Sequence, residues 1–414
     1  MKKYIIVVVT ALVTVINSNA QNKEISKKEK KEIIKVISNN LLETYVDLEL
    51  AKKMSSKIIS NRKTKKYKSI TNPIQFSKVL TKDLQEVSKD LHLRVNYEPK
   101  KIAQKKRNLP EELKLKRQKI MMMRMASVNY GFTELKILNG NIGYLNLRMF
   151  ADIKFAKDAA TAAMNFLSNT NAIIIDLREN RGGVPNMMQL LSSYFTDAKP
   201  VLLSNFYERK TNSKTQIYTF ESIDGKRMTN KPLYILTSNK TFSAAEAFTY
   251  TLKHYNKAIV VGEVTKGGAN RTKRINLDAN FSMSTPYIKA INPITNENWE
   301  GKGVQPDIKT DTKNAFVIAY INAINKTVKR NKNRILNKIG YEFLKDKAID
   351  KAIIVFEKNV KMFPKDANSW DSLGEAYFMN RDKENSLKAY KKALELDPNS
   401  VSVKKMIQKL NNIK

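Results

Sequence analysis

Three short runs of apolar residues constrain the fold of this chain more than any other feature. They are Ala172–Ile175, Pro232–Thr237 and Ala258–Gly262. Short runs without a polar face are typical of strands buried on both sides, as in a parallel sheet. Each run is followed by a polar or glycine-rich segment, and open α/β sheets place their functional loops at such strand ends. We therefore expect an α/β core of alternating strands and helices over residues 131–312.

The second run leads to Ser243, the first residue of a Ser-Ala-Ala-Glu segment that ends at Glu246. The pattern predicts a strand, a sharp turn and a helix that opens on a serine. A helix N-terminus offers unpaired N–H groups and the positive end of the helix dipole. A hydroxyl there suits an acyl-transfer nucleophile, because its oxyanion must be stabilised as it forms. The structural alternative is a capping box, which has the same Ser-x-x-Glu pattern.

Two further motifs accompany this serine. Residues 176–183 are Asp-Leu-Arg-Glu-Asn-Arg-Gly-Gly, and residues 303–307 are Gly-Val-Gln-Pro-Asp. The Ser-Ala-Ala-Glu segment lies between them in the chain. These three motifs in this order make residues 80–310 resemble the C-terminal processing, or tail-specific, serine proteases. The resemblance is closer to the branch of the tricorn core protease and the interphotoreceptor retinoid-binding proteins. It implies a crotonase-like α/β protease core with Ser243 as the nucleophile.

The resemblance also implies roles for the residues around the serine. The N–H groups of Ala244 and of Gly182 or Gly183 would form the oxyanion hole. Arg178 and Asn180 are candidates for substrate binding, since a guanidinium suits a carboxylate. The alternative for Arg178 is to support the oxyanion loop through backbone carbonyls. No metal and no cofactor is implied, and the sequence contains neither a His-Glu-x-x-His motif nor a phosphate-binding glycine loop.

A serine nucleophile needs a general base, which is a proton acceptor within hydrogen-bond reach. The sequence leaves the identity of this base open. In the processing proteases it is a lysine, whose place falls on Gly268, while Lys266 lies two positions earlier. In the tricorn branch it is a histidine, whose place holds Asn146, with a glutamate that matches Glu300. His92 resembles the histidine of an Asp-x-His element that these families carry before the core. His92 is the first candidate and Glu300 the second, with structural packing and a surface position as their alternatives; Lys266 is the third.

The N-terminal segment predicts export. Residues 1–20 have a charged start, an apolar centre and small residues before Gln21, as in a secretory signal peptide. The apolar stretch is shorter than the roughly twenty residues of a membrane-spanning helix. The chain has no cysteine, so it offers neither a lipid-attachment site nor a disulfide. We expect secretion across an inner membrane and a periplasmic mature protein.

Helices are expected before and after the core. Residues 21–130 predict an N-terminal helical domain and a basic connector, with too little room for a PDZ domain. Residues 313–334 predict a linker helix. Residues 335–414 predict an all-α pair of tetratricopeptide hairpins, because Trp-x-x-Leu-Gly-x-x-Tyr at 370–377 fits the 34-residue pattern and a weaker copy precedes it. Such repeats suggest a protein partner.

The formal net charge of +36 would suit a nucleic-acid or membrane-surface protein. Lysine is abundant throughout, however, and no nucleic-acid module accompanies it. We predict no nucleic-acid partner; contact with an anionic membrane surface stays open but is not predicted.

Taken together, these patterns predict an exported serine endopeptidase of the tail-specific class that cleaves peptide or protein substrates through a Ser243 acyl-enzyme. One alternative is a catalytically inactive relative that binds apolar ligands or peptides in a cavity near Ser243. The other is a scaffold in which the repeats carry the function.

Overall fold

The computed structural model describes residues 24–106 and 110–412. The predicted signal peptide, residues 1–20, lies outside the described residues. The described chain forms two compact units. The first unit contains residues 24–88, 93–106 and 274–285, and the second contains residues 89–92, 110–273 and 286–412. Among the helices of the described chain, none combines the length and apolar character that a membrane span requires.

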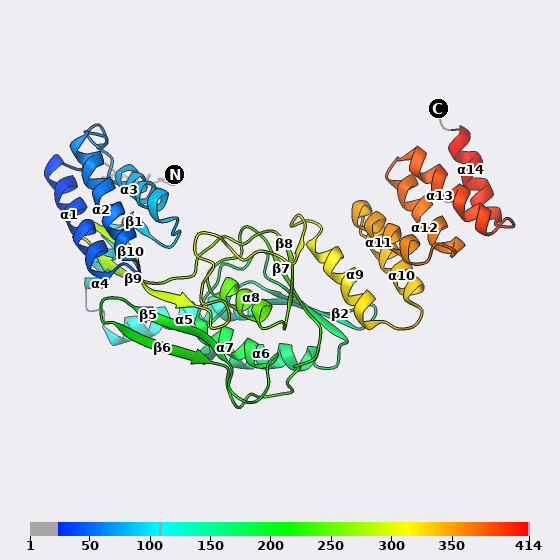
Figure 1. Ribbon diagram of the computed structural model, residues 1–414, viewed down its shortest axis with the longest axis horizontal. Coiled ribbons are helices and arrows are strands. Elements are labelled where there is room, and N and C mark those ends of the chain that lie inside the picture. The colour runs from blue at the N-terminus through cyan, green and yellow to red at the C-terminus, as the bar shows by residue number, and fades with distance from the viewer. Residues whose placement is uncertain (1–23, 107–109, 413–414) are drawn as a thin grey trace, which may run out of the picture. The chain divides into compact units, whose positions relative to one another are not determined.

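The first unit is mainly helical, as the sequence predicted for this region (Figure 1). Ile37 and Leu41 lie one helical turn apart and are both buried in its core, whereas the next residue, Leu42, is 38% exposed. Its helices are α1 (Lys27–Thr44), α2 (Leu48–Lys63), α3 (Pro73–Ser88) and α4 (Pro99–Lys106).

A strand pair completes this unit. Strand β1 (Arg94–Tyr97) pairs antiparallel with the first half of β10 (Phe281–Ile291). Phe281 and Met283 of β10 join the apolar core formed by α1–α3. Residues 274–285 lie within the predicted protease core along the sequence, yet they fold with the N-terminal helices. Strand pairing depends on spatial proximity and not on sequence separation.

The second unit contains a sheet that has six strands within the described chain, in the order β11-β8-β7-β4-β3-β2. The three apolar runs of the sequence became β4, β7 and β8, which are adjacent and parallel. The antiparallel hairpin β2–β3 lies at one edge of this sheet, and its turn contains two residues with positive φ angles, Gly140 and Asn141. The strands are β2 (Phe132–Leu138), β3 (Ile142–Leu147), β4 (Ala172–Asp176), β7 (Leu233–Thr237), β8 (Ile259–Gly262) and β11 (Ile308–Lys309).

Helices cover both faces of this sheet. Side chains alternate along a strand, so Ile173 and Ile175 face one layer while Ile174 faces the other. Helices α6 (Ile153–Leu167), α7 (Pro185–Ser193) and α8 (Ala244–His254) pack on the first face. Helix α9 (Ala315–Thr327), predicted as a linker, packs on the opposite face. The predicted α/β class is therefore confirmed.

Several shorter elements surround the sheet. Strands β5 (Leu202–Glu208) and β6 (Ser213–Tyr218) form a hairpin, and β5 pairs with the second half of β10. Strand β9 (Arg271–Asn276) pairs with β10. Helix α5 (Glu111–Ala126) carries most of the basic connector and has no buried residue, and a 3₁₀ turn, η1 (Asn129–Gly131), follows it.

The C-terminal region consists of helical hairpins. They are formed by α10 (Lys332–Lys345), α11 (Ile349–Met362), α12 (Ala367–Met379) and α13 (Lys383–Leu396), followed by α14 (Val401–Asn412). A Cβ atom on Gly340 would lie 2.3 Å from the Phe356 ring, and one on Gly374 would lie 2.9 Å from the Tyr390 ring. The same contact thus recurs at the tetratricopeptide period. The first hairpin packs on α9, which supplies the neighbour that so short an array needs.

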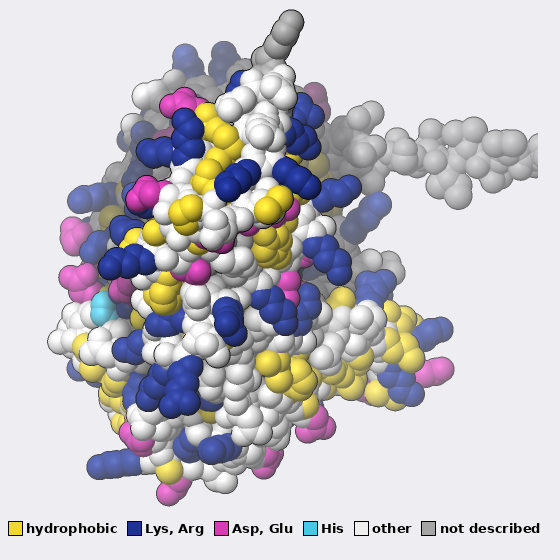
Figure 2. Space-filling model, turned by 90° about the vertical axis from the view of Figure 1, so that its right-hand side faces the viewer, with side chains coloured by type: hydrophobic (Ala, Val, Ile, Leu, Met, Phe, Trp, Pro, Cys, Tyr) yellow, Lys and Arg dark blue, Asp and Glu magenta, His cyan; other side chains and the backbone are white. Residues whose placement is uncertain are grey.

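Basic side chains are dispersed over the surface. On the face shown in Figure 2, lysine and arginine lie among acidic, neutral and apolar side chains and do not gather into one patch. This distribution agrees with a general compositional excess of lysine.

Candidate active site

Ser243 occupies a sharp turn between β7 and α8, as the sequence predicted. Its backbone angles are φ 56° and ψ −121°, and α8 begins at the next residue. A non-glycine residue with this φ is strained and persists only where its surroundings hold it. The turn presents the serine at the N-terminus of α8.

The side chain of Glu246 holds this turn in place. It is fully buried, and its carboxylate accepts the N–H of Ser243 at 2.8 Å. It also accepts the N–H groups of Gly267 at 2.6 Å and Gly268 at 2.9 Å, and the hydroxyl of Thr265. Burial raises the pKa of Glu246, and these hydrogen bonds oppose that rise. The capping glutamate therefore joins the serine turn to the glycine loop after β8.

Two backbone N–H groups beside Ser243 remain available for an oxyanion. The N–H of Gly182 donates to Oδ1 of Asn180 at 2.8 Å, whereas within the described chain the N–H groups of Gly183 and Ala244 have no recorded acceptor. A Cβ on Gly182 would lie 2.7 Å from Cβ of Ser243, so this loop touches the serine. Of the two glycines left open by the sequence, the geometry favours Gly183.

Arg178 and Asn180 lie behind the oxyanion loop. Asn180 is fully buried and donates through Nδ2 to the carbonyl of Leu147 at 2.8 Å. Arg178 forms an ion pair with Asp176 and donates through Nη1 to the carbonyl of Thr312 at 2.7 Å. Neither residue lines the cavity that contains Ser243. Arg178 thus occupies the supporting position that the sequence left as its alternative.

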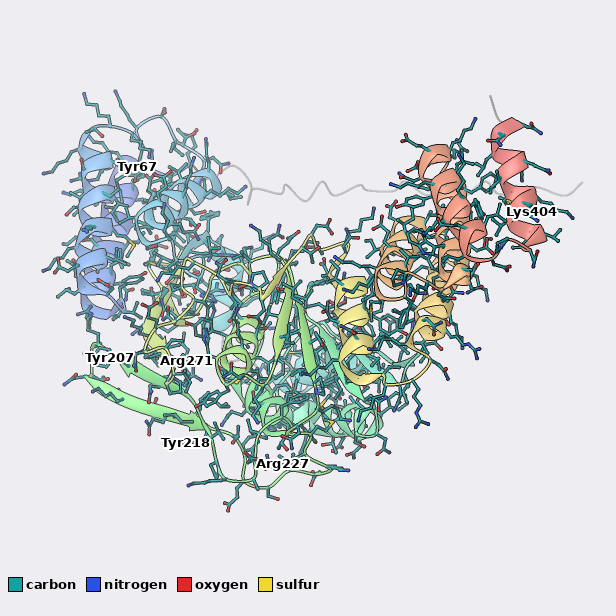
Figure 3. The ribbon with its side chains drawn as sticks, turned by 45° about the vertical axis from the view of Figure 1, so that its right-hand side comes forward. Tyr67, Tyr207, Tyr218, Arg227, Arg271 and Lys404 are labelled. Carbon is teal, nitrogen blue, oxygen red and sulfur yellow. The ribbon has the colours of Figure 1, made fainter. Side chains whose placement is uncertain are left out.

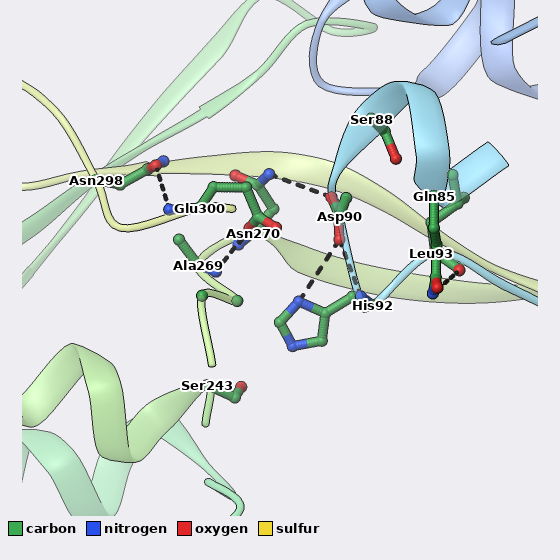
Figure 4. A network of polar contacts seen from close by, with 12 residues as sticks. Gln85, Ser88, Asp90, His92, Leu93, Ser243, Ala269, Asn270, Asn298 and Glu300 are labelled. Carbon is green, nitrogen blue, oxygen red and sulfur yellow. Dashed lines mark hydrogen bonds and ion pairs between the residues drawn. The ribbon is translucent and has the colours of Figure 1, made fainter. Parts of the chain in front are cut away.

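His92 lies beside Ser243, although 151 positions separate them in the sequence. Its N–H donates to Oδ1 of Asp90 at 3.0 Å, and its ring Nδ1 lies 3.8 Å from the same oxygen. The other ring nitrogen faces the side on which Ser243 lies (Figure 4). The ring packs on Phe242, with 4.4 Å between the centroids. Both His92 and Ser243 line the same cavity. The imidazole of His92 therefore lies between the carboxylate of Asp90 and the side on which the hydroxyl of Ser243 lies.

Glu300 lies next to this pair. Its Oε2 accepts the N–H groups of Ala269 at 2.7 Å and Asn270 at 3.0 Å, and its Oε1 is buried without a hydrogen-bond partner in the described chain. Burial, with the nearby charge of Asp90, raises the pKa of Glu300 to about 8. Near neutral pH the two carboxyl groups are therefore not both ionised. One ligand atom from each of Asp90, His92 and Glu300 lies within 4.8 Å of the others, a spacing that could hold a metal ion.

Gly268 shows why a lysine base does not fit this site. A Cβ on Gly268 would lie 2.2 Å from the Phe242 ring and 2.6 Å from Cε1 of His92. The histidine and the phenylalanine fill the space that a longer side chain would need. Lys266 is exposed, and its ammonium lies 5.7 Å from the centroid of the Phe242 ring. Of the three base candidates, only His92 lines the cavity with the serine.

We predict that Gly268→Ala slows covalent labelling of Ser243 by at least about tenfold, because the added methyl would displace Phe242 and His92. The matched control is Gly374→Ala, which overpacks the Tyr390 ring in the repeats. Both variants should lose some thermal stability, but only the first should label slowly with a fluorophosphonate. Equal labelling rates in the two variants would contradict the role assigned to this glycine.

A cavity of about 280 Å³ opens beside the serine. Apolar and polar residues both line it, and its lining residues include neither aspartate nor glutamate. The apolar part is formed by Met188, Leu203, Phe206, Ala247, Ala290 and Trp299. Sequence reasoning missed these residues, because they come from separate helices and strands that only the fold brings together.

Comparison with known proteins gives family matches over three regions of the chain. Residues 141–310 match the family described as "Peptidase family S41". Residues 20–129 match the "N-terminal domain of Peptidase_S41 in eukaryotic IRBP", and residues 367–400 match a tetratricopeptide repeat.

Individual relatives are more distant. A "Probable CtpA-like serine protease" of Staphylococcus aureus strain N315 is 27% identical over 248 residues, which are 59% of this chain and 46% of the relative. The chain thus spans about half the length of that relative. Among solved structures, the photosystem II D1 C-terminal processing protease is 13% identical with a TM-score of 0.43, covering 70% of this chain and 94% of that one. A lipoprotein from Streptococcus agalactiae is 14% identical with a TM-score of 0.44, covering 68% and 92%.

Proposed function

We propose that this chain, of which residues 141–310 match peptidase family S41 and residues 20–129 match an N-terminal domain of that family, is an exported serine endopeptidase with Ser243 as its nucleophile. One observation carries the proposal: His92, backed by Asp90, lies in the same cavity as Ser243 and beside two unpaired N–H groups. A serine held in a strained turn, a base and an oxyanion site are the three parts that acyl transfer needs. Export rests on the sequence of residues 1–20.

The proposed reaction begins when Oγ of Ser243 attacks the carbonyl carbon of a peptide bond. His92 takes the hydroxyl proton, and Asp90 stabilises the imidazolium that forms. The carbonyl oxygen becomes an oxyanion, which accepts hydrogen bonds from the N–H groups of Gly183 and Ala244. The C–N bond then breaks as His92 protonates the leaving amine. Water, deprotonated by His92, attacks the acyl-enzyme and releases the second product.

Glu300 completes the charge arrangement in this mechanism. Its two backbone N–H partners fix its carboxyl group next to Asp90. A protonated Glu300 beside an ionised Asp90 places one negative charge next to the imidazole. This arrangement would orient His92 and favour its charged form during acylation.

The alternative of an inactive protein that binds apolar ligands also predicts a cavity beside Ser243. It does not require a strained serine, an imidazole that faces it or unpaired N–H groups in reach. These features therefore favour the enzyme. The repeats fit an additional role in contact with a protein partner, because their helical hairpins are the usual form of such surfaces.

Covalent labelling of the purified mature protein with a fluorophosphonate tests the proposal. We expect the wild type to be labelled and Ser243→Ala to lose the label, because the probe reacts only with an activated serine. The matched control, Ser213→Ala, changes an exposed serine on β6 and should label as the wild type does. Absence of label from the wild type, with folding verified by circular dichroism, would favour the binding protein instead.

A further inference from the structure

The cavity beside Ser243 contains one permanently charged side chain, that of Arg271 at the start of β9 (Figure 3). The remaining lining residues are apolar or neutral apart from His92, and none of them is acidic. A single cation among apolar and uncharged polar residues can discriminate between substrates, because it favours a ligand group of opposite charge and disfavours one of like charge.

Arg271 lies over an aromatic ring of the cavity wall. Its Cζ lies 4.7 Å from the centroid of the Phe206 ring, and Phe206 is itself nearly buried as part of that wall. The face of an aromatic ring attracts a guanidinium cation electrostatically. This contact uses none of the hydrogen-bond donors of the guanidinium.

Within the described chain, no ion pair or hydrogen bond is recorded for the Arg271 guanidinium. Two other arginines near the sheet, Arg178 and Arg227, differ in this respect. Arg178 is paired with Asp176, and Arg227 donates to backbone carbonyls that include those of Phe220 and Glu221. The donors of those two arginines are used by the fold, whereas Arg271 presents a planar fork of five donors.

We propose that Arg271 binds a carboxylate of the substrate, next to an apolar side chain that fills the cavity. The inference rests on the proposed function and names the substrate class of the same site. A guanidinium and a carboxylate form two parallel hydrogen bonds in a bidentate geometry. Because no acidic residue lines the cavity, the carboxylate must come from the ligand. The carboxylate can come from an acidic side chain or from the C-terminus of the substrate.

Arg271 thus takes the role of carboxylate-binding cation for which the sequence offered Arg178 as the candidate. The two arginines could not be told apart by sequence, because each follows a glycine-rich or strand-end segment. Their surroundings differ in one respect: Asp176 neutralises Arg178, whereas Arg271 has an aromatic ring beneath it.

The test uses two matched pairs of fluorescent peptides with an apolar residue at the cleavage site. One pair differs only in a C-terminal carboxylate or amide, and the other only in an internal Glu or Gln. Binding is measured by fluorescence anisotropy to Ser243→Ala, which retains the cavity but cannot turn over. We expect the acid member of one pair to bind at least about tenfold more tightly, as for a hydrogen bond between charged groups, and the pair that responds identifies the source.

The variant Ser243→Ala/Arg271→Gln should lose that preference, and Ser243→Ala/Arg271→Lys should retain part of it. The matched control is Ser243→Ala/Lys273→Gln. Lys273 is a cation on the same strand that lies over the Tyr287 ring, 5.1 Å from its centroid, and does not line the cavity. This control should keep the full preference.

Equal binding within both pairs, or a preference that survives Arg271→Gln, would overturn the assignment. Because binding is measured on a variant without the nucleophile, the result does not depend on turnover. A wild type that fails to react with the fluorophosphonate would overturn the proposed function alone.

Discussion

His92→Gln is expected to lower kcat/KM for peptide hydrolysis by about a thousandfold, within the range that a positioned general base contributes. Glutamine keeps most of the side-chain volume beside Phe242 and Gly268, but it cannot accept the proton of Ser243. The loss should appear in kcat, because the imidazole acts during bond making and breaking and not in substrate binding. Fluorogenic peptide hydrolysis and the rate of fluorophosphonate labelling should fall together.

The matched control is His254→Gln. His254 is the second histidine of the chain, stacks on Tyr250 with 4.2 Å between the centroids, and does not line the cavity with Ser243. This variant should hydrolyse peptides at the wild-type rate. If His92→Gln also did so, the base would have to be Glu300 or Lys266, and Glu300→Gln and Lys266→Ala would distinguish them.

Glu246→Ala is expected to lower the free energy of unfolding of the second unit by more than about 3 kcal/mol. The substitution removes the acceptor of three backbone N–H groups and one hydroxyl, all around a fully buried carboxylate. Unsatisfied buried donors cost about 1–3 kcal/mol each, and the cavity left by the side chain adds to the loss. Urea denaturation followed by tryptophan fluorescence should report the change, since Trp299 donates to the carbonyl of Gly268 in the same loop.

Two variants separate this effect from a general loss of charge. Glu246→Gln retains the volume and one acceptor oxygen, so we expect a smaller loss than for alanine. Glu179→Ala removes an exposed glutamate that pairs with Lys240 and should change stability by less than about 1 kcal/mol. If Glu246→Ala and Glu179→Ala unfolded at the same urea concentration, Glu246 would not hold the serine turn as proposed.

Local patterns were sufficient where one segment specifies its own structure. The apolar runs at 172–175 and 232–237 became adjacent parallel strands, because a segment without a polar face can only be buried on both sides. The helix after Ser243 begins where its capping pattern predicted. The repeat period placed Gly374 against Tyr390, because small and aromatic residues at fixed spacing allow paired helices to nest.

The sequence by itself therefore determined the α/β core, the strained serine turn and the helical repeats, all of which follow from residues close together in the chain. Only the tertiary structure decided which base candidate shares a cavity with Ser243, which glycine N–H has no recorded acceptor in the described chain, and which arginine lines that cavity. Those outcomes depend on contacts between distant segments: His92 occupies the space left by Gly268, Asn180 engages Gly182, and Asp176 neutralises Arg178 while Arg271 lies over the Phe206 ring. Spacing along a chain fixes side-chain direction within one element, but packing between elements fixes which side chains meet.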